Sequence, residues 1–366
     1  MARVKLGDVA REYKATCGDQ KEGLRVVGLE HLIPQQIILT LWDEGKENTF
    51  TKMFKKGQVL FGRRRAYLMK AAVAPFDGIC SGDITVIEAI PGKILPELLP
   101  FIIQNDTLFD FAVERSAGSL SPRVKWEHLK NFEFELPELD RQKELADILW
   151  ASERAKTAYR ELISSTDELV KSQFIEMFGT TKTFADRWEL QPIKSCCQII
   201  SGYPFNSKLF NEIAEGTPLI RIRDVMRGYT ETYTTEITDD SHIIHEGDLL
   251  IGMDGDFGIS KWKSSPAFLN QRVCKISGNI GVINNEFLLY FLAPWLKEVN
   301  EGTMFATVKH ISIKQIESAM IPVVDYHTQE RFASFVEQLD KSKFAAKQAL
   351  ENLERTQKSL MNRYLG

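Results

Sequence analysis

An internal repeat, whose second copy runs to the last residue, constrains the fold of this chain more than any other feature. A chain that resembles itself is read first as repeated structural units. A constant offset without a gap, held across about 38 residues, indicates a duplicated helical unit. The same residue types recur 187 positions apart at Gln142 and Gln329, Ala146 and Ala333, Lys156 and Lys343, Ala158 and Ala345, and Lys171 and Lys358.

Both copies of the repeat have the pattern of long helices. Neither contains an internal proline or glycine, and small or apolar residues recur at alternating spacings of three and four, as in a coiled-coil seam. Each helix would have about 36 residues and be roughly 54 Å long. We expect an intramolecular antiparallel coiled coil, whereas the alternative is that each helix packs only on its own domain. The residues predicted to pair the helices are Leu145, Ile148, Tyr159, Leu162 and Leu169, and Phe332, Phe335, Leu339, Leu353 and Leu360.

The segments that precede the two helices also resemble each other, although more loosely. Residues 56–62 (KGQVLFG) align with residues 246–252 (EGDLLIG), and each stretch predicts a tight turn, a buried strand and a glycine. Later in each segment, a polar loop begins at Gly118 or Gly302 and carries a lysine seven residues on, at Lys125 or Lys309. The sequence therefore predicts an α+β fold of two similar domains, residues 1–137 and 180–322, each followed by a helical region, residues 138–179 and 323–366.

Composition narrows the class of protein further. With 43% hydrophobic and 10% aromatic residues, the 366-residue chain is expected to be globular and to hold two or three domains. No apolar run approaches the roughly 20 residues of a membrane helix, and the N-terminus lacks an apolar signal core, so we expect a cytoplasmic location. The five cysteines have no C-x-x-C spacing and are expected to be reduced thiols. A net charge of −4 argues only weakly against nucleic-acid binding, because a local basic surface decides it.

Basic residues gather in both copies. Residues 63–65 are three consecutive arginines with Tyr67 nearby, and in the second copy Arg221 and Arg223 alternate as on one face of a strand. Lys261 is a further basic residue beside Trp262. Arginine forks bind phosphate oxygens or the O6 and N7 atoms of guanine. A solvated charged loop is the alternative for each cluster alone, but basic clusters in both copies favour a polyanionic ligand.

Catalytic and metal-binding patterns are missing. Residues 251–258 (IGMDGDFG) follow a predicted strand but lack the G-x-G-x-x-G spacing of a dinucleotide site. Asp254 and Asp256 have no further calcium ligands after them, and His242 and His245 have no cysteine or glutamate partner for zinc, so turns are the expected structure. We find no P-loop and no nucleophile elbow. Two similar units without chemistry of their own predict two binding events.

These residues carry a resemblance to a known family. The segments 27–32 (VGLEHL), 202–208 (GYPFNSK) and 218–224 (PLIRIRD) resemble the specificity subunit of a type I restriction-modification system. The segments that lead from each domain into the following helix, at Leu136-Pro137 and Ile321-Pro322, also resemble this family. The resemblance covers essentially all 366 residues. The first of these segments is two residues shorter than the second, counted from Pro137 to Gln142 and from Pro322 to Gln329.

The resemblance implies a fold and a role. Two target recognition domains would each read one half of an asymmetric bipartite site in double-stranded DNA. The two helices would pair with pseudo-twofold symmetry, set the gap between the halves, and dock two methyltransferase subunits. Those partners would use S-adenosylmethionine to methylate adenine at N6, and restriction subunits using ATP and Mg would join them. The chain itself would have no catalytic residue, no bound cofactor or metal, and no membrane partner.

The resemblance does not supply individual DNA contacts, so we choose them by polarity and by equivalent positions in the two copies. A coiled-coil scaffold that bridges two partners is the alternative function, and a self-contained enzyme with an unrecognised site is a third. The predicted DNA contacts are Arg63, Arg64, Arg65, Ser119, Arg123 and Lys125 in the first domain, and Lys208, Arg221, Arg223, Lys261, Thr303 and Lys309 in the second.

Overall fold

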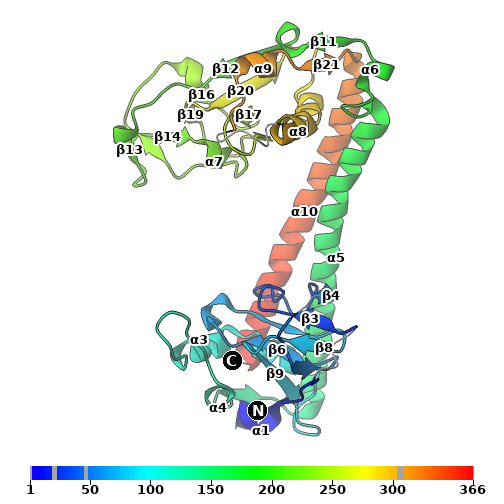
Figure 1. The fold of residues 1–366 in the computed structure, drawn as a ribbon, viewed down its shortest axis with the longest axis vertical. Coiled ribbons are helices and arrows are strands. Elements are labelled where there is room, and N and C mark those ends of the chain that lie inside the picture. Colours follow the sequence, from blue (N-terminus) through cyan, green and yellow to red (C-terminus); the bar gives the residue numbers. More distant parts are fainter. Residues whose placement is uncertain (1, 19–22, 45–47, 303–308, 366) are drawn as a thin grey trace. The chain divides into compact units, whose positions relative to one another are not determined.

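The computed structural model describes residues 2–18, 23–44, 48–302 and 309–365. The chain forms two compact units, which are Met1–Leu162 with Ala346–Gly366 (unit 1) and Ile163–Ala345 (unit 2). Each unit contains one α+β module and a segment of each of the two long helices (Figure 1). None of the helices in the described ranges combines the length and the apolar character needed to cross a bilayer.

The module of unit 1 contains two four-stranded sheets and a short two-stranded ribbon. One sheet has the order β2 (Ala10–Glu12), β9 (Ile84–Ala89), β6 (Val59–Gly62) and β7 (Ala71–Val73). The other has the order β4 (Asp43–Glu44), β3 (Arg25–Val27), β8 (Gly78–Cys80) and β5 (Lys52–Phe54). The ribbon pairs β1 (Ala2–Lys5) with β10 (Glu133–Leu136). The helices are α1 (Leu6–Val9), η1 (Ala66–Leu68), α2 (Leu99–Ile103), α3 (Asp106–Glu114) and α4 (Trp126–Leu129).

The module of unit 2 contains a four-stranded sheet, a five-stranded sheet and a similar ribbon. The first sheet has the order β12 (Cys197–Ser201), β20 (Val273–Gly278), β17 (Leu249–Gly252) and β18 (Gly258–Lys261). The second has the order β13 (Phe210–Asn211), β15 (Tyr233–Thr234), β14 (Thr217–Ile220), β19 (Ala267–Leu269) and β16 (Ile243–Ile244). The ribbon pairs β11 (Leu190–Pro192) with β21 (Met320–Pro322). The helices are α6 (Phe184–Arg187), η2 (Ile193–Ser195), η3 (Ser207–Leu209), α7 (Ile222–Val225), η4 (Asp240–His242), α8 (Asn285–Gly302) and α9 (Ile313–Glu317).

The two modules have the same topology. In chain order, β2, β6, β7 and β9 correspond to β12, β17, β18 and β20, and both sheets have the same strand order. Each second sheet has one parallel pair at its centre, β3 with β8 or β14 with β19, flanked by antiparallel neighbours. The predicted α+β fold of two similar halves is therefore confirmed, and β13 is the strand that unit 2 adds.

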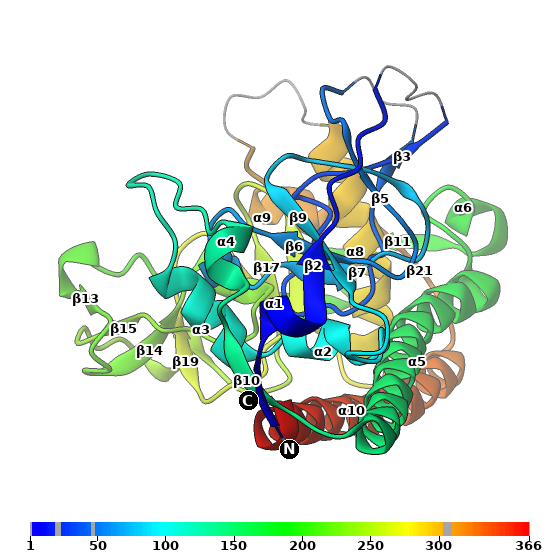
Figure 2. The ribbon, with the colours of Figure 1, turned by 90° about the horizontal axis from the view of Figure 1, so that it is seen from below.

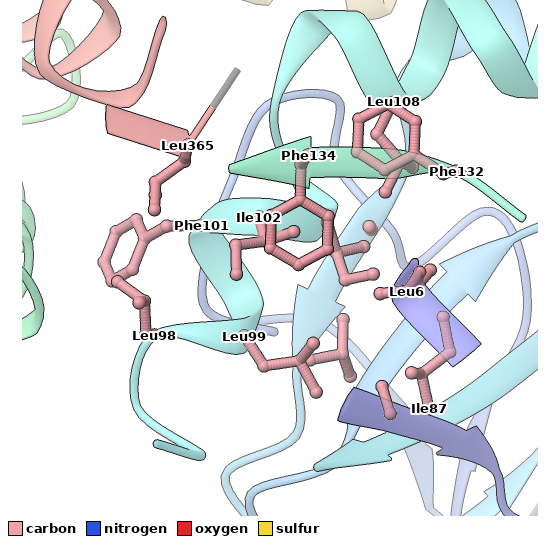
Figure 3. Packing of buried hydrophobic residues seen from close by; sticks show 14 of the residues in the cluster. Leu6, Ile87, Leu98, Leu99, Phe101, Ile102, Leu108, Phe132, Phe134 and Leu365 are labelled. Carbon is pink, nitrogen blue, oxygen red and sulfur yellow. The ribbon is translucent and has the colours of Figure 1, made fainter. Parts of the chain in front are cut away.

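Aromatic and aliphatic side chains join each module to the helices. In unit 1 the last turn of α10 reaches the core, where Leu365 lies near Leu98 and Phe101 (Figure 3). In unit 2 Phe174 of α5 packs against Phe287 of α8 and Phe332 of α10, with ring centroids 5.7 and 5.4 Å apart. Burial of several rings in each cluster stabilises the junction, since a fully buried Phe side chain contributes roughly 1.5–3 kcal/mol.

The repeated glutamines explain part of the sequence repeat. Gln142 is buried, donates to the carbonyl of Pro137 at 2.8 Å and accepts from the amide of Leu95 at 3.0 Å. Gln329 is buried, donates to Val324 at 2.9 Å and accepts from the amide of Asn284 at 2.9 Å. In each unit one side chain therefore fastens the first turn of a long helix to the loop before the module's apolar helix.

The long helices α5 (Leu139–Phe178) and α10 (Tyr326–Leu365) lie side by side in each unit (Figures 1 and 2). In unit 1 Arg160 pairs with Glu354 at 2.8 Å. In unit 2 Asp167, further along α5, pairs with Lys343, which is earlier on α10. The helices therefore run antiparallel, and the predicted packing of one helix against the other is confirmed.

The buried faces of the helices differ from the predicted seam at alternate positions. The predicted residues Ile148, Leu162 and Leu169 are 48%, 46% and 48% exposed, whereas Leu149, Lys156 and Val170 are buried. The seam of α5 thus has a spacing of four then three, not three then four, and its second position falls one residue later. Adjacent apolar pairs such as Leu169-Val170 fit either spacing. Of the other predicted seam residues, Leu145 and Phe332 are buried, and Tyr159, Phe335, Leu339, Leu353 and Leu360 are partly buried.

All five cysteines are free thiols, and only Cys17 is partly exposed. Burial raises the pKa of the Cys80 thiol to about 12 and that of Cys274 to about 12. A thiol with so high a pKa is a poor nucleophile near neutral pH, because the thiolate is the reactive form.

Candidate nucleic-acid interface

Three arginines surround one carboxylate at the end of strand β6 in unit 1. Arg123 donates to Asp83 through Nε at 2.7 Å and through Nη2 at 3.1 Å. Arg63 and Arg64, the first residues after β6, approach the same carboxylate at 3.9 and 3.8 Å. The hydrogen bond from Arg123, together with the neighbouring arginine charges, holds the pKa of Asp83 below its usual range. Three guanidiniums against one carboxylate leave a local charge of +2.

The loop before α4, residues 117–124, is held against the end of β6 by backbone and side-chain hydrogen bonds. The amide of Arg65 donates to the carbonyl of Pro122 at 2.8 Å, and the amide of Val124 donates to the carbonyl of Arg63 at 3.0 Å. Arg64 Nη2 donates to Ser121 Oγ at 3.0 Å. Sequence-distant arginines are thus brought to one place by strand pairing.

The surface beside this cluster is hollowed. A depression of about 800 Å³ is lined by Arg63, Asp83 and Arg123 together with Lys14 and Lys52, among others. The Nε atom of Arg63 is buried and has no hydrogen-bond partner among the described residues. The side chains of Arg63 and Arg123 are themselves 32% and 42% exposed, so this basic depression fits the acceptor oxygens of a phosphate backbone.

The remaining candidates of unit 1 lie nearby on the same loop. Ser119 is exposed in the bend between Ala117 and Arg123, whose backbones pair. Lys125 is exposed and occupies the N-cap position of α4. The structure therefore brings Arg63, Arg64 and Arg123 into contact through Asp83 and leaves Ser119 and Lys125 on the adjoining surface.

The candidates of unit 2 are more dispersed. The exposed residues are Lys208 in η3, Arg221 before α7 and Arg223 within α7. Strand β14 ends at Ile220, so the expectation that Arg221 and Arg223 share one strand face is wrong. Because Asp224 accepts from the Arg221 amide at 2.9 Å, the chain turns into a helix there instead.

Two further candidates of unit 2 are constrained by their neighbours. Lys261 is paired with Glu286, which neutralises its charge. The amide of Gly255 donates to the carbonyl of Lys309 at 3.1 Å, the bond that Arg65 makes with Pro122 in unit 1. Lys309 therefore corresponds to Pro122 and not to Lys125, with which the sequence had aligned it. Thr303 lies outside the described residues.

A charged cluster that the sequence presented only as a turn lies at the end of β17. His310 Nδ1 lies 2.6 Å from Asp254 Oδ1, and Arg272 Nε lies 3.7 Å from Asp254 Oδ2. Arg272 Nη1 also lies 3.3 Å from His310 Nδ1. No group of three or more acidic, histidine or cysteine side chains suited to a metal ion is found in the described part of the chain.

Two similar α+β modules, each continued by a long helix and each carrying charged loops at equivalent strand ends, define a protein built from two copies of one structural unit. The family model for the "Type I restriction modification DNA specificity domain" matches residues 4–163 and 185–355, and the chain belongs to this family.

Individual relatives agree with that family. The chain is 34% identical over 180 residues to the type I restriction enzyme EcoBI specificity subunit of Escherichia coli, a match covering 48% of this chain and 38% of that relative's length. It is 21% identical over 367 residues to the type I restriction enzyme MjaVIII specificity subunit of Methanocaldococcus jannaschii, covering 93% and 80%. A solved structure from work on complex assembly and conformational transition of the type I R-M system has a TM-score of 0.62 and 19% identity, covering 100% of this chain and 97% of that one. That likeness concerns the fold.

Proposed function

We propose that this chain is the DNA-specificity subunit of a type I restriction-modification complex and does no chemistry itself. The module of each unit, residues 1–137 and residues 180–322, reads one half of an asymmetric bipartite site in double-stranded DNA. The observation that carries the proposal is the pair of charged clusters at equivalent strand ends in two modules of one topology. Because the charges of the two clusters differ, the two half-sites differ.

The helical regions, residues 138–179 and 323–366, set the number of base pairs between the half-sites and dock two methyltransferase subunits. Support for docking comes from α5, which leaves Ile148 exposed in unit 1 and Leu169 and Ile175 exposed in unit 2. Exposed apolar side chains on a long helix are typical of a surface that another protein covers. The partners supply the chemistry, with S-adenosylmethionine in the methyltransferase subunits and ATP and Mg in the restriction subunits.

Charge reversal at the basic cluster distinguishes DNA binding from a scaffold role. The triple variant Arg63→Glu, Arg64→Glu, Arg65→Glu, in complex with the methyltransferase partner, should bind target DNA more weakly and with a shallower salt dependence, because phosphate contacts release counterions. The matched control Arg154→Glu alters an exposed arginine on α5. Partner binding and DNA binding both unchanged in the triple variant would favour a coiled-coil scaffold instead.

Helix length tests the spacing role. Seven residues inserted after Leu162 in α5 and seven after Ala345 in α10 would lengthen the pair by about 10 Å. At about 3.4 Å per base pair, the unread gap should grow by about three base pairs. An insertion in α5 alone mismatches the helices and serves as the control. A gap that does not respond to the double insertion contradicts the spacing role.

A further inference from the structure

The strand ends after β6 and β17 share one backbone frame. The amide of Arg63 donates to the carbonyl of Asp83 at 3.0 Å, and the amide of Met253 donates to the carbonyl of Arg272 at 2.9 Å. The amide of Val124 reaches the carbonyl of Arg63 at 3.0 Å, as that of Ile311 reaches Met253 at 2.9 Å. These hydrogen bonds fix the correspondence between the two modules without reference to sequence identity.

The turn that follows is also the same in both units. Arg65 has φ 55° and Gly255 has φ 72°, so in each unit the third residue after the glycine that closes the strand has a left-handed backbone conformation. Only glycine adopts this conformation without cost, and a side chain held there is strained. Unit 1 keeps an arginine in that conformation, whereas unit 2 uses a glycine.

Two of three side-chain positions on this frame have opposite charges in the two units, and the third changes from arginine to histidine. The isolated bridge between Arg64 and Arg123 corresponds to that between Asp254 and His310. Since Asp83 and Arg272 both precede the neighbouring strand, the order arginine, aspartate, arginine in unit 1 becomes aspartate, arginine, histidine in unit 2. Together with Arg63, which corresponds to the uncharged Met253, unit 1 has the local charge of +2 described above, whereas Asp254 and Arg272 balance each other.

If these ion pairs served only to hold the loop in place, the charges would not need to be reversed between the units, because an ion pair holds the loop whichever side carries the carboxylate. The reversed residues are also accessible, since the Arg64 and Asp254 side chains are 39% and 29% exposed. Arg64 spends one of its five N–H donors on Ser121 Oγ. In contact with DNA, arginine forks pair with guanine O6 and N7, whereas a carboxylate is repelled by phosphates and accepts from the N4 amino group of cytosine.

We propose that the second residue after the strand-closing glycine is a base-reading position of opposite preference in the two units. Arg64 donates to guanine in one half-site, and Asp254 accepts from the cytosine amino group in the other. Arg123 and His310 are positioning residues, which hold the neighbouring carboxylate and the loop. This assignment rests on the proposed function and adds to it which residues discriminate and which bases they select.

Methylation mapping of the chain with its methyltransferase partner tests the assignment. Asp254→Ala should lower the preference for the cytosine-containing base pair in one half-site at least about fivefold, with the other half-site and the gap unchanged. Arg64→Ala should relax a guanine in the other half-site by a similar factor. If Asp254→Ala does not assemble, Asp254→Asn is the near-isosteric replacement and should change the selected base from cytosine to adenine, which asparagine reads.

Two controls separate base reading from a structural clasp. His310→Ala removes one of the partners of the Asp254 carboxylate, and Ser121→Ala removes the hydrogen-bond acceptor of Arg64, without altering either proposed reading residue. Both should reduce methylation evenly across sequences and leave the consensus unchanged. An unchanged consensus in both Asp254→Ala and Arg64→Ala, or the same consensus change in the controls, overturns the assignment. If the unaltered chain directs no bipartite methylation, the proposed function fails instead.

Discussion

A buried polar cluster in the helix pair of unit 1 predicts an unusually costly lysine substitution. The Lys156 amine contacts the Glu153 carboxylate and the Gln357 amide oxygen, and Gln357 Nε2 donates to Glu153 Oε1 at 2.8 Å. The side chains of Lys156 and Glu153 are each only 6% exposed. The repeat supplies a matched control, because Lys343 occupies the equivalent position of α10 and its partner Asp167 has a side chain that is 50% exposed.

The expected magnitude follows from burial. Lys156→Met leaves the Glu153 charge without its cation, which should lower the free energy of unfolding of unit 1 by about 3–5 kcal/mol. Lys343→Met breaks a partly solvated pair and should cost at most about 1 kcal/mol. Replacing all three members together, as Glu153→Leu, Lys156→Met and Gln357→Leu, removes the unpaired groups and should recover most of the loss.

Hydrogen exchange measures these energies locally, because amides of the helix pair in unit 1 report opening of that segment. The readout is the change in protection for residues 149–160 and 350–361, with urea unfolding as a second measure. Costs of Lys156→Met and Lys343→Met that agree within about 1 kcal/mol would refute the role assigned to burial of the Lys156 pair. A triple variant less stable than Lys156→Met would refute it equally.

The fold carries further measurable consequences. The lowered pKa of Asp83 means that its ion pairs stabilise unit 1 above the normal aspartate pKa and are lost as the pH falls through the lower folded-state pKa, so hydrogen exchange in residues 117–124 should accelerate only at strongly acidic pH. Exchange of this loop that follows an ordinary aspartate titration would contradict that pairing. Cys17 should be the one thiol of five that a disulfide reagent labels within minutes in the native protein, because the others are buried. Rapid labelling of two or more thiols would show that the buried sites open. Gln142→Ala and Gln329→Ala should each cost about 1–3 kcal/mol in urea unfolding, because each leaves a buried carbonyl without its hydrogen-bond donor, while Gln338→Ala at an exposed position of α10 should be near neutral.

The duplication and the helices could be predicted from the sequence because their signals are local and periodic. Proline-free heptad patterns at a fixed offset leave few alternatives to two paired helices. The seam register was predicted one residue early at alternate positions, since Ile148-Leu149 and Leu169-Val170 fit either spacing. Lys156 is the residue that separates the predicted spacing from the observed one, because it is buried in the structure. A lysine is not expected to be buried from sequence alone, since its partners on the other helix are not known at that point.

The charged clusters could not be predicted because their members meet only through strand pairing. Asp83 lies 40 residues from Arg123 in the chain, and His310 lies 56 residues from Asp254. The glycines around Asp254 predicted a turn correctly as local structure but gave no sign of its partners. A lysine count from the loop glycine aligned Lys125 with Lys309, whereas the backbone hydrogen bonds align Lys309 with Pro122. These two loops share their backbone hydrogen bonds although their residue spacing differs.

The central claim is that one chain holds two DNA-reading units of different preference. Methylation sequencing of the genome of a cell that expresses this chain with its methyltransferase partner tests it most directly. We expect one asymmetric motif of two short specific halves separated by a gap of fixed length, absent when the partner is expressed alone. Methylation confined to a continuous or palindromic motif, or none that depends on this chain, would contradict it.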